Sequence, residues 1–259
     1  MSQKAAKRQR QTQRTPPPPT SSKGTGIPRR WLYAGAGIVG AVILVVAIVI
    51  SLSGGDSSEP ASTSAIDGGT IEQMLEGIPQ DGTWIGAPDA PAVLVEFADL
   101  QCPFCKNFAN SVLPQLIEDY VRPGKVRMEW QGLAFIGPDS ETALRFALAA
   151  GEQNKLWNVT ELLYRYQGGE NDGWVTDDLL RGVGEAIPGL DVDKAFADMD
   201  SDAVDAGIQA SSQRAQAQLP RISTPSFLAG PAGTDPKYLE LESLDYETVK
   251  AELDKILAG

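Results

Sequence analysis

The chain carries its apolar residues in two different patterns. Residues 31–52 form one uninterrupted run without a charge, whereas residues 92–257 contain short apolar segments and longer ones in which apolar positions recur every three or four residues. The run of 22 residues predicts one transmembrane helix, since at about 1.5 Å per residue it crosses a hydrocarbon core of about 30 Å. The mixed pattern predicts an α/β domain.

Four short segments predict strands. Residues 92–98 form an apolar, β-branched run, and residues 125–131 alternate between apolar and polar positions. Residues 226–229 run into Gly230, and residues 238–241 follow as their expected hairpin partner. Short runs of this composition, bounded by turn residues, are typical of strands.

Helical spacing of apolar residues predicts seven helices. The first contains Pro114, which lacks an N–H donor and predicts a kink. The predicted helices occupy residues 108–120, 140–153, 156–166, 176–186, 192–199, 202–219 and 245–257. Five of them fall between the second and third strands. We therefore expect an α/β sheet interrupted by a helical insertion at about residues 138–219.

Charge divides the chain at the apolar run. Residues 1–30 carry eight Lys and Arg and no acid, so they predict a basic, disordered tail, while all 34 acidic residues follow position 52. Because positive charge stays on the cytoplasmic side, Arg29 and Arg30 predict a single-pass protein of the cell membrane with its amino terminus inside. The competing interpretation, a secretory signal peptide, has a shorter apolar core of about 7–15 residues.

The remaining chain would then lie outside the cytoplasm. Residues 53–79 begin with a Ser-, Gly- and Thr-rich stretch and predict a flexible linker. Residues 80–259 are long enough for one hydrophobic core and form the predicted domain. Their acidic character argues against nucleic-acid binding, because phosphates would be repelled.

The chain has two cysteines, in the sequence Cys102-Pro103-Phe104-Cys105. A C-x-x-C pair is a redox dithiol, half of a zinc site or a structural disulfide. Zinc normally takes four ligands, and this chain has no histidine and no second cysteine pair. A disulfide closing so short a loop would constrain the unfolded chain very little. The pattern therefore favours a working dithiol in an oxidising compartment, with neither metal nor cofactor.

The position of the dithiol assigns different tasks to the two sulfurs. It follows the strand at 92–98 and opens the next helix, so Cys102 lies at a helix amino terminus. Free N–H groups and the helix dipole there stabilise a thiolate. We expect Cys102 to be the exposed nucleophile, and Cys105, one turn further on and facing inward, to resolve the mixed disulfide.

These residues resemble a known family. Val95–Cys105, followed by Lys106–Phe108 and Val112–Pro114, is similar to the DsbA-type thioredoxin-fold proteins, in the membrane-anchored branch whose active sites read Cys-Pro-x-Cys. Ser223–Phe227 is similar to the Thr-Pro segment of that family. The resemblance covers roughly residues 80–258. It implies a thioredoxin fold with an inserted helical domain and thiol–disulfide exchange on protein substrates.

The resemblance also suggests supporting residues. Glu96 corresponds to a buried acid that relays a proton to or from the inner cysteine, although an edge-strand glutamate in water is the alternative. Pro225 is expected to be cis and to face the dithiol, exposing the backbone of Thr224 for pairing with substrate. Pro103 is the family's proline between the cysteines. Phe104 either contacts substrate or packs against the protein.

Two further residues and one departure complete the predicted site. Asp99 and Lys106 flank the dithiol and are expected to be solvated neighbours without a catalytic task. The best-known oxidases carry histidine where this chain has Phe104. Phenylalanine offers the thiolate no positive charge, so we expect a weaker oxidant.

Three functions remain open from the sequence. The first is an oxidase that donates the Cys102–Cys105 disulfide to exported cysteine-containing proteins and is reoxidised by a DsbB-like or vitamin K epoxide reductase-like membrane oxidase. The second is a reductase or isomerase, for example in cytochrome maturation. The third is a non-catalytic binding module tethered to the envelope through residues 31–52.

Overall fold

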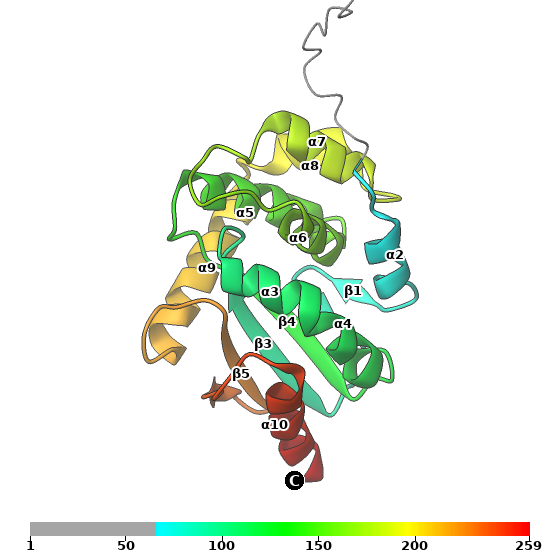
Figure 1. Ribbon diagram of the computed structural model, residues 1–259, viewed down its shortest axis with the longest axis vertical. Coiled ribbons are helices and arrows are strands. Elements are labelled where there is room, and N and C mark those ends of the chain that lie inside the picture. The colour runs from blue at the N-terminus through cyan, green and yellow to red at the C-terminus, as the bar shows by residue number, and fades with distance from the viewer. Residues whose placement is uncertain (1–65) are drawn as a thin grey trace, which may run out of the picture. The chain divides into compact units, whose positions relative to one another are not determined.

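A six-stranded mixed sheet forms the frame of residues 66–259, the part of the chain that the computed structural model describes (Figure 1). The basic tail at 1–30, the predicted transmembrane helix at 31–52 and the first part of the predicted linker lie outside these residues. Among the helices that are described, none has the length and apolarity that crossing a membrane requires.

The strand order in the sheet is β1–β2–β4–β3–β5–β6, with β3 in the interior. Strand β3 runs parallel to β4 and antiparallel to β5, and β5 and β6 form the predicted hairpin. The strands are β1 (Gln80–Asp81), β2 (Trp84–Ile85), β3 (Ala92–Ala98), β4 (Val126–Gly132), β5 (Ser226–Pro231) and β6 (Lys237–Leu239). Because β3 is hydrogen-bonded on both edges, the dithiol that follows it starts from a fixed point.

The helical segment after the dithiol covers one face of the sheet together with the C-terminal helix (Figure 1). It consists of α3 (Pro103–Ser111), α4 (Leu113–Leu116) and the π-helical turn η2 (Ile117–Val121), and the C-terminal helix is α10 (Tyr246–Ala258). The break between α3 and α4 confirms the predicted kink. Pro114 has no N–H to donate to the carbonyl four residues earlier, so the helix cannot continue unbroken.

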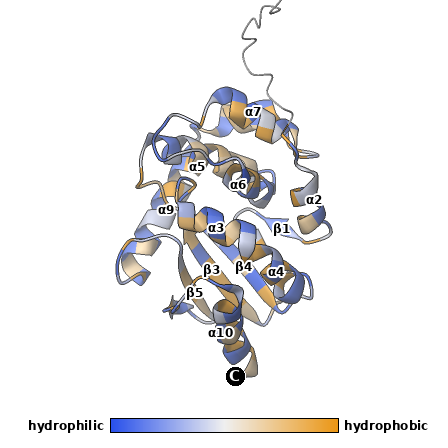
Figure 2. Ribbon diagram, in the orientation of Figure 1, coloured by the Kyte–Doolittle hydropathy of each residue, from blue (hydrophilic) through white to orange (hydrophobic). Residues whose placement is uncertain are grey.

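Five helices lie between β4 and β5. They are α5 (Pro138–Gly151), α6 (Leu156–Arg165), α7 (Asp177–Glu185), α8 (Val192–Asp198) and α9 (Asp202–Gln218). Side-chain oxygens of Thr176, Asp191 and Ser201 accept hydrogen bonds from the first turns of α7, α8 and α9 and define their starts. In Figure 2 hydrophobic and hydrophilic residues lie side by side on these helices, as amphipathic packing requires.

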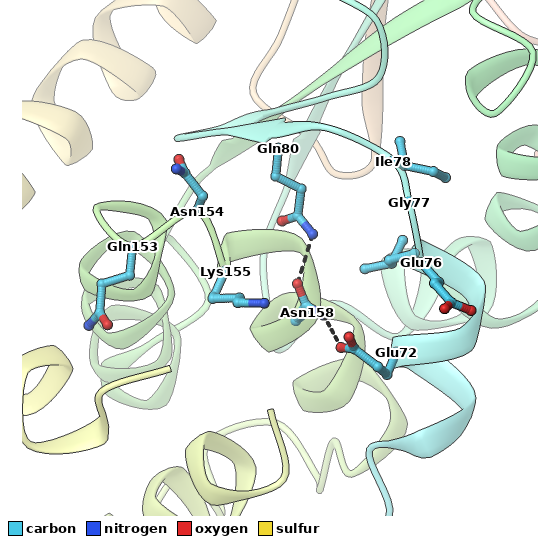
Figure 3. Close-up of a pocket in the computed structure, with 10 residues that line it drawn as sticks. Glu72, Glu76, Gly77, Ile78, Gln80, Gln153, Asn154, Lys155 and Asn158 are labelled. Carbon is cyan, nitrogen blue, oxygen red and sulfur yellow. Dashed lines mark hydrogen bonds between the residues drawn. The ribbon is translucent and has the colours of Figure 1, made fainter. Parts of the chain in front are cut away.

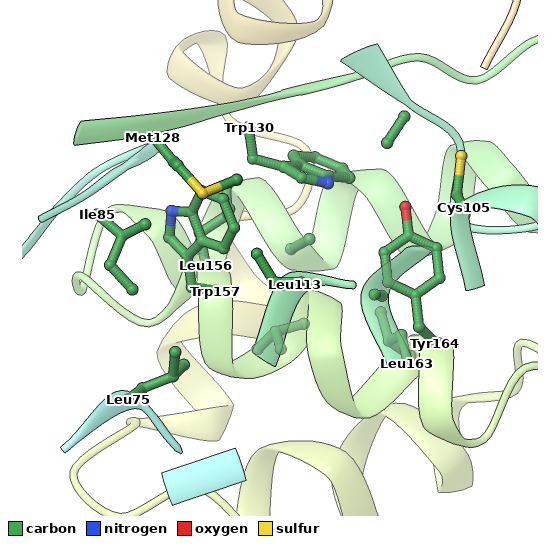
Figure 4. Packing of buried hydrophobic residues seen from close by; sticks show 14 of the residues in the cluster. Leu75, Ile85, Cys105, Leu113, Met128, Trp130, Leu156, Trp157, Leu163 and Tyr164 are labelled. Atoms are coloured by element: carbon green, nitrogen blue, oxygen red, sulfur yellow. The ribbon is translucent and has the colours of Figure 1, made fainter. Parts of the chain in front are cut away.

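The apolar faces meet in one core that joins the sheet to the helical insertion. Figure 4 shows Met128 and Trp130 of β4 packed beside Leu156 and Trp157 of α6. Helix α6 also packs against α3, which carries the dithiol, while α9 lies on the other face of the sheet. The insertion is therefore built into the same core as the strands and supports α3 from the side.

The predicted linker is wrong for its C-terminal part. Residues 69–75 form helix α2 (Gly69–Leu75), which packs against α6 and buries Ile71 and Leu75. These two residues are four apart and so share one helix face. The two-residue strands β1 and β2 follow, and they are too short to produce a periodic signal. The packed domain therefore begins well before residue 80.

Candidate active site

The dithiol lies at the junction between β3 and α3. Cys102 is the residue that precedes α3, with an extended backbone (φ −70°, ψ 121°). Pro103 is the first helical residue, a position where its missing N–H has no intrahelical partner to lose. The N–H of Lys106 donates to the carbonyl of Cys102 at 3.1 Å and closes the first turn. Cys105 is thereby placed one turn inward, beneath Cys102.

Both cysteines are buried, which corrects the expectation of an exposed Cys102. Cys102 retains 4% of its surface and Cys105 none. The cover comes from the segment before β5, because the Cys102 thiol donates to the carbonyl of Thr224 at 3.3 Å. The Thr224–Pro225 peptide bond is cis, as predicted. Thus the structure brings the Thr-Pro segment onto the dithiol, 122 residues away in sequence.

The surroundings of Cys102 stabilise a thiolate. A hydrogen bond from the Cys105 thiol is the largest of the causes that lower its pKa to about 6, from about 9 for the free group. The Thr224 side chain and the backbone N–H groups of Phe104 and Cys105 act in the same direction, against partial burial. Cys102 is therefore ionised at neutral pH, as expected at a helix start.

Cys105 is in the opposite condition. Burial raises the pKa of its thiol well above that of a free thiol, and the hydrogen bond that it donates to Cys102 adds to this effect. Negative charge on Cys102 and Glu96 acts in the same direction. Cys105 thus stays protonated while Cys102 is ionised, and it needs a proton acceptor before it can act as a nucleophile.

Glu96 lies directly beneath the dithiol, on the interior strand β3. It is 2% exposed, which excludes the alternative of an edge-strand glutamate in water. Burial, the larger cause, and negative charge on Cys102 raise its pKa to about 8. Its Oε1 atom has no hydrogen-bond partner in the described part of the chain. A carboxyl with this pKa can exchange a proton near neutral pH.

Two buried residues of α6 were not predicted to belong to this site. The Tyr164 hydroxyl points toward the sulfur of Cys105 (Figure 4), and burial raises the pKa of Tyr164 well above its usual value. Glu161, one turn earlier, is also buried, and its pKa is raised by burial and then by the charge of Glu96. Glu161 is the one acid in α6, and this was its only sequence signal.

Asp99 corrects a second expectation. It was expected to lie in water, but it is fully buried and its carboxylate accepts four hydrogen bonds. Lys106 is partly buried, and its ammonium group donates to the carbonyl of Gln167 at 3.0 Å. Both residues therefore have fixed partners inside the protein.

Three exposed apolar side chains lie on segments that contribute to the dithiol site, one in the first turn of α3 and two in loops. Phe104, between the cysteines, is 65% exposed, so it does not pack into the core. Ile222 precedes the segment that covers Cys102, and Phe135 lies on the loop after β4, whose N–H groups donate to Asp99. Exposed apolar groups gathered at one place are typical of a protein-binding surface.

A polar pocket lies apart from the dithiol (Figure 3). Its volume is about 290 Å³, and it lies between α2, β1 and the start of α6. Across it the Gln80 amide donates to Asn158 at 2.8 Å, and the Asn158 amide donates to Glu72 at 3.2 Å. These bonds tie α2 to α6 and account for the pocket's polar lining.

A C-x-x-C pair at a helix start, beneath a cis-proline segment and on a sheet of this topology, defines a thioredoxin-fold protein equipped for thiol–disulfide exchange. A family model described as thioredoxin matches residues 79–255. The chain belongs to this family, as a DsbA-type thiol:disulfide oxidoreductase. It is therefore an enzyme, and the non-catalytic binding module is not supported.

The similar proteins agree with this assignment. The probable disulfide bond formation protein D of Bacillus cereus is 32% identical over 176 residues, which cover 67% of this chain and 77% of that protein. The structure of oxidised BdbD from Bacillus subtilis has a TM-score of 0.60 at 23% identity and covers 70% of this chain and 98% of its own. The structure of alpha-DsbA1 from Wolbachia pipientis has a TM-score of 0.56 at 19% identity, covers 71% of this chain and 92% of its own, and shares the fold.

Proposed function

We propose that this protein oxidises the cysteines of exported proteins with its Cys102–Cys105 disulfide. The observation that carries the proposal is the position of Cys102 at the start of α3, where hydrogen bonds from the Cys105 thiol, the Thr224 side chain and two backbone N–H groups lower its pKa to about 6. A thiolate stabilised in this way is a good leaving group, and it stabilises the reduced form of the enzyme. An enzyme whose reduced form is stabilised readily transfers its disulfide to a substrate.

The exchange proceeds in two displacements. A substrate thiolate attacks the Cys102 sulfur, the bond between Cys102 and Cys105 breaks, and Cys105 leaves with the electron pair and takes up a proton from Glu96. A second substrate thiolate then attacks the substrate sulfur of the mixed disulfide and releases Cys102 as a thiolate. The substrate loses two electrons to form a disulfide, and the enzyme gains two and is left as the dithiol.

The substrate is a polypeptide that is not yet folded. Phe104 in the first turn of α3 and Phe135 and Ile222 in loops offer exposed apolar contacts to an unfolded chain, which exposes its own apolar residues. Thr224 offers backbone groups for strand-like pairing next to Cys102. Apolar contacts and backbone pairing together recognise a chain without requiring one sequence.

The remaining assignments follow from the first part of the chain and from the relatives. Residues 31–52 anchor the protein in the cell membrane, with residues 53–259 outside the cytoplasm. A DsbB-like or vitamin K epoxide reductase-like membrane oxidase accepts the two electrons and restores the disulfide. The Bacillus relatives are named disulfide bond formation proteins, which supports the oxidising direction.

One observation favours the reverse direction as a second candidate. Phe104 stands between the cysteines and brings neither a hydrogen-bond donor nor a positive charge to the thiolate. The disulfide is then a weaker oxidant, and the same dithiol would serve as a reductase or isomerase if a reducing partner supplied electrons. The redox state of the protein in its cell separates the two, since an oxidase is held oxidised and a reductase reduced.

The direct test combines an assay and a trap. Oxidised protein is mixed with a reduced, unfolded substrate, and disulfide formation is followed against protein carrying Cys102→Ser. In parallel, Cys105→Ala is expressed in cells and its mixed disulfides are purified, because this variant cannot resolve them. Exported cysteine-containing proteins bound through Cys102 support the proposal, and an absence of both oxidation and trapped partners contradicts it.

A further inference from the structure

The carboxylate of Asp99 connects three separate segments at the dithiol end of the sheet. Its Oδ1 atom accepts from the N–H of Gln101 at 2.9 Å and from the hydroxyl of Ser140 at 2.5 Å. Its Oδ2 atom accepts from the N–H groups of Phe135 at 3.1 Å and Ile136 at 3.2 Å. The dithiol loop, the first turn of α5 and the loop after β4 are thus hydrogen-bonded to one buried side chain.

The backbone of the same residue closes the turn that leads to the nucleophile. The N–H of Cys102 donates to the carbonyl of Asp99 at 2.9 Å. The insertion holds the loop independently through Gln167, whose amide donates to the carbonyls of Leu100 at 2.7 Å and Cys102 at 3.2 Å. Residues 99–102 are therefore held by two sets of hydrogen bonds. Gln167 forms one set, and the side chain of Asp99 is the centre of the other.

We propose that Asp99 is a positioning residue for thiol–disulfide exchange, whose carboxylate fixes residues 99–102 and with them the Cys102 sulfur against the helical insertion. The inference rests on the proposed function and adds to it the part that the insertion plays. Hydrogen bonds weaken steeply with misalignment, so a loop that shifts by a fraction of an ångström loses part of the thiolate's stabilisation.

The sign of the effect separates positioning from direct charge. The titratable groups around the Cys102 sulfur are Cys105 on α3, Glu96 on β3 and, next to Cys105, Tyr164 on α6. If Asp99 acted mainly as a nearby negative charge, removing it would lower the pKa of Cys102. If it acts by positioning, removing it raises that pKa, because the donors no longer point at the sulfur.

The experiment is a titration of the Cys102 thiolate by its ultraviolet absorbance in the reduced full-length protein carrying Asp99→Asn. We expect the pKa to rise and the thiolate fraction at pH 6 to fall about three- to tenfold. Ser140→Ala, which removes one of the four donors, should give a smaller change in the same direction. Asp89→Asn removes the same charge from an exposed position and should change nothing.

Two results would overturn the inference. An unchanged pKa with a lowered unfolding midpoint would make Asp99 a folding residue only, and a lowered pKa would make it a charge effect. If Asp99→Asn does not fold, Ser140→Ala decides, and an unchanged pKa in that variant overturns the inference. The titration needs no substrate, so a wild-type protein that fails to oxidise substrate would contradict the proposed function and leave this result standing.

Discussion

The start of α3 and the core beneath it hold two sulfurs, one helical turn apart, in opposite conditions. At the start of the helix, the Cys105 thiol, the Thr224 side chain and two backbone N–H groups lower the pKa of Cys102 to about 6. In the core, burial raises the pKa of Cys105 far above the usual value, with Glu96 and Tyr164 as neighbours. At neutral pH Cys102 is thus ionised, while Cys105 stays protonated until a base accepts its proton.

This contrast gives the reduced protein a defined pH dependence. A group with a lowered folded-state pKa contributes stability above its unfolded pKa and loses it as the pH falls through the folded value. For Cys102 that window runs from about 9 down to about 6. Ionisation of Cys102 therefore favours the dithiol over the disulfide increasingly between pH 6 and 9, which strengthens the enzyme as an oxidant.

The largest effect should come from removing one sulfur at a time. Cys102→Ser should reduce exchange to the background, because a hydroxyl neither ionises nor leaves at neutral pH. Cys105→Ser leaves the Cys102 thiolate able to attack a substrate disulfide but lacks the thiol that displaces the substrate, so mixed disulfide should accumulate, which mass spectrometry detects. Equal reactivity of the two single-cysteine variants toward a thiol reagent at pH 7 would contradict the division of tasks.

Glu96→Gln should have the next largest effect, through the inner sulfur. When Cys105 attacks the mixed disulfide and releases the substrate, in the reverse of the first displacement, Glu96 accepts the proton of Cys105. General-base catalysis typically contributes about a hundredfold or more, so this release should slow by at least about tenfold at pH 8. In the wild type the rate of release should rise with pH through about 8, the pKa of Glu96, and this rise should disappear in the variant. Glu185→Gln, an exposed acid on α7, serves as the control.

The same variant should change stability with a definite sign. The folded-state pKa of Glu96 is raised from 4.5 to about 8, so folded protein holds a proton that unfolded protein releases between these values. Stability is therefore lost as the pH rises through this window. In urea unfolding of the reduced protein, Glu96→Gln should be more stable by roughly a few kcal/mol at pH 8 and nearly equal at pH 4. A constant difference across this range would contradict the assignment.

Phe104→His should increase the difference between the pKa values of the two cysteines by acting on Cys102. A protonated imidazole next to Cys102 would stabilise the thiolate further and leave Cys105 unaffected. We expect the reduction potential against glutathione to rise by about 30 mV, a tenfold change in the equilibrium constant. Phe104→Leu is the matched control for the loss of the aromatic ring. A potential that rises equally in both variants would assign the effect to the ring.

The features that build the site around the two cysteines differ in how well the sequence predicts them. The Cys102–Cys105 spacing and the apolar run of β3 are local patterns, and both predict the observed structure. The burial of Asp99 depends on Phe135 and Ser140, about 40 residues further on, and no local pattern carries that information.

The cover over Cys102 is a related case. The Thr-Pro motif and the dithiol were each predicted, but the burial of the sulfur follows from their contact, to which Thr224 contributes from 122 residues away. Helix α2 was missed for another reason, since its seven residues follow a polar stretch and only Ile71 and Leu75 mark its buried face. Long-range packing decided the burial of the Cys102 sulfur, whereas α2 was missed because its local signal is weak.

The smallest effect should come from removing exposed apolar side chains on the side of Cys102. Phe135→Ser and Ile222→Ser should each raise KM for an unfolded polypeptide about three- to tenfold, since each removes a contact worth roughly 1 kcal/mol. The pKa of Cys102 and the rate with a small disulfide should stay the same, because neither side chain is among the groups that shift this pKa. Tyr238→Ser, an exposed aromatic on β6, is the control. If all three variants raise KM equally, the apolar contacts are not specific to the dithiol. If only Phe135→Ser and Ile222→Ser raise KM, the substrate binds next to the Cys102 sulfur.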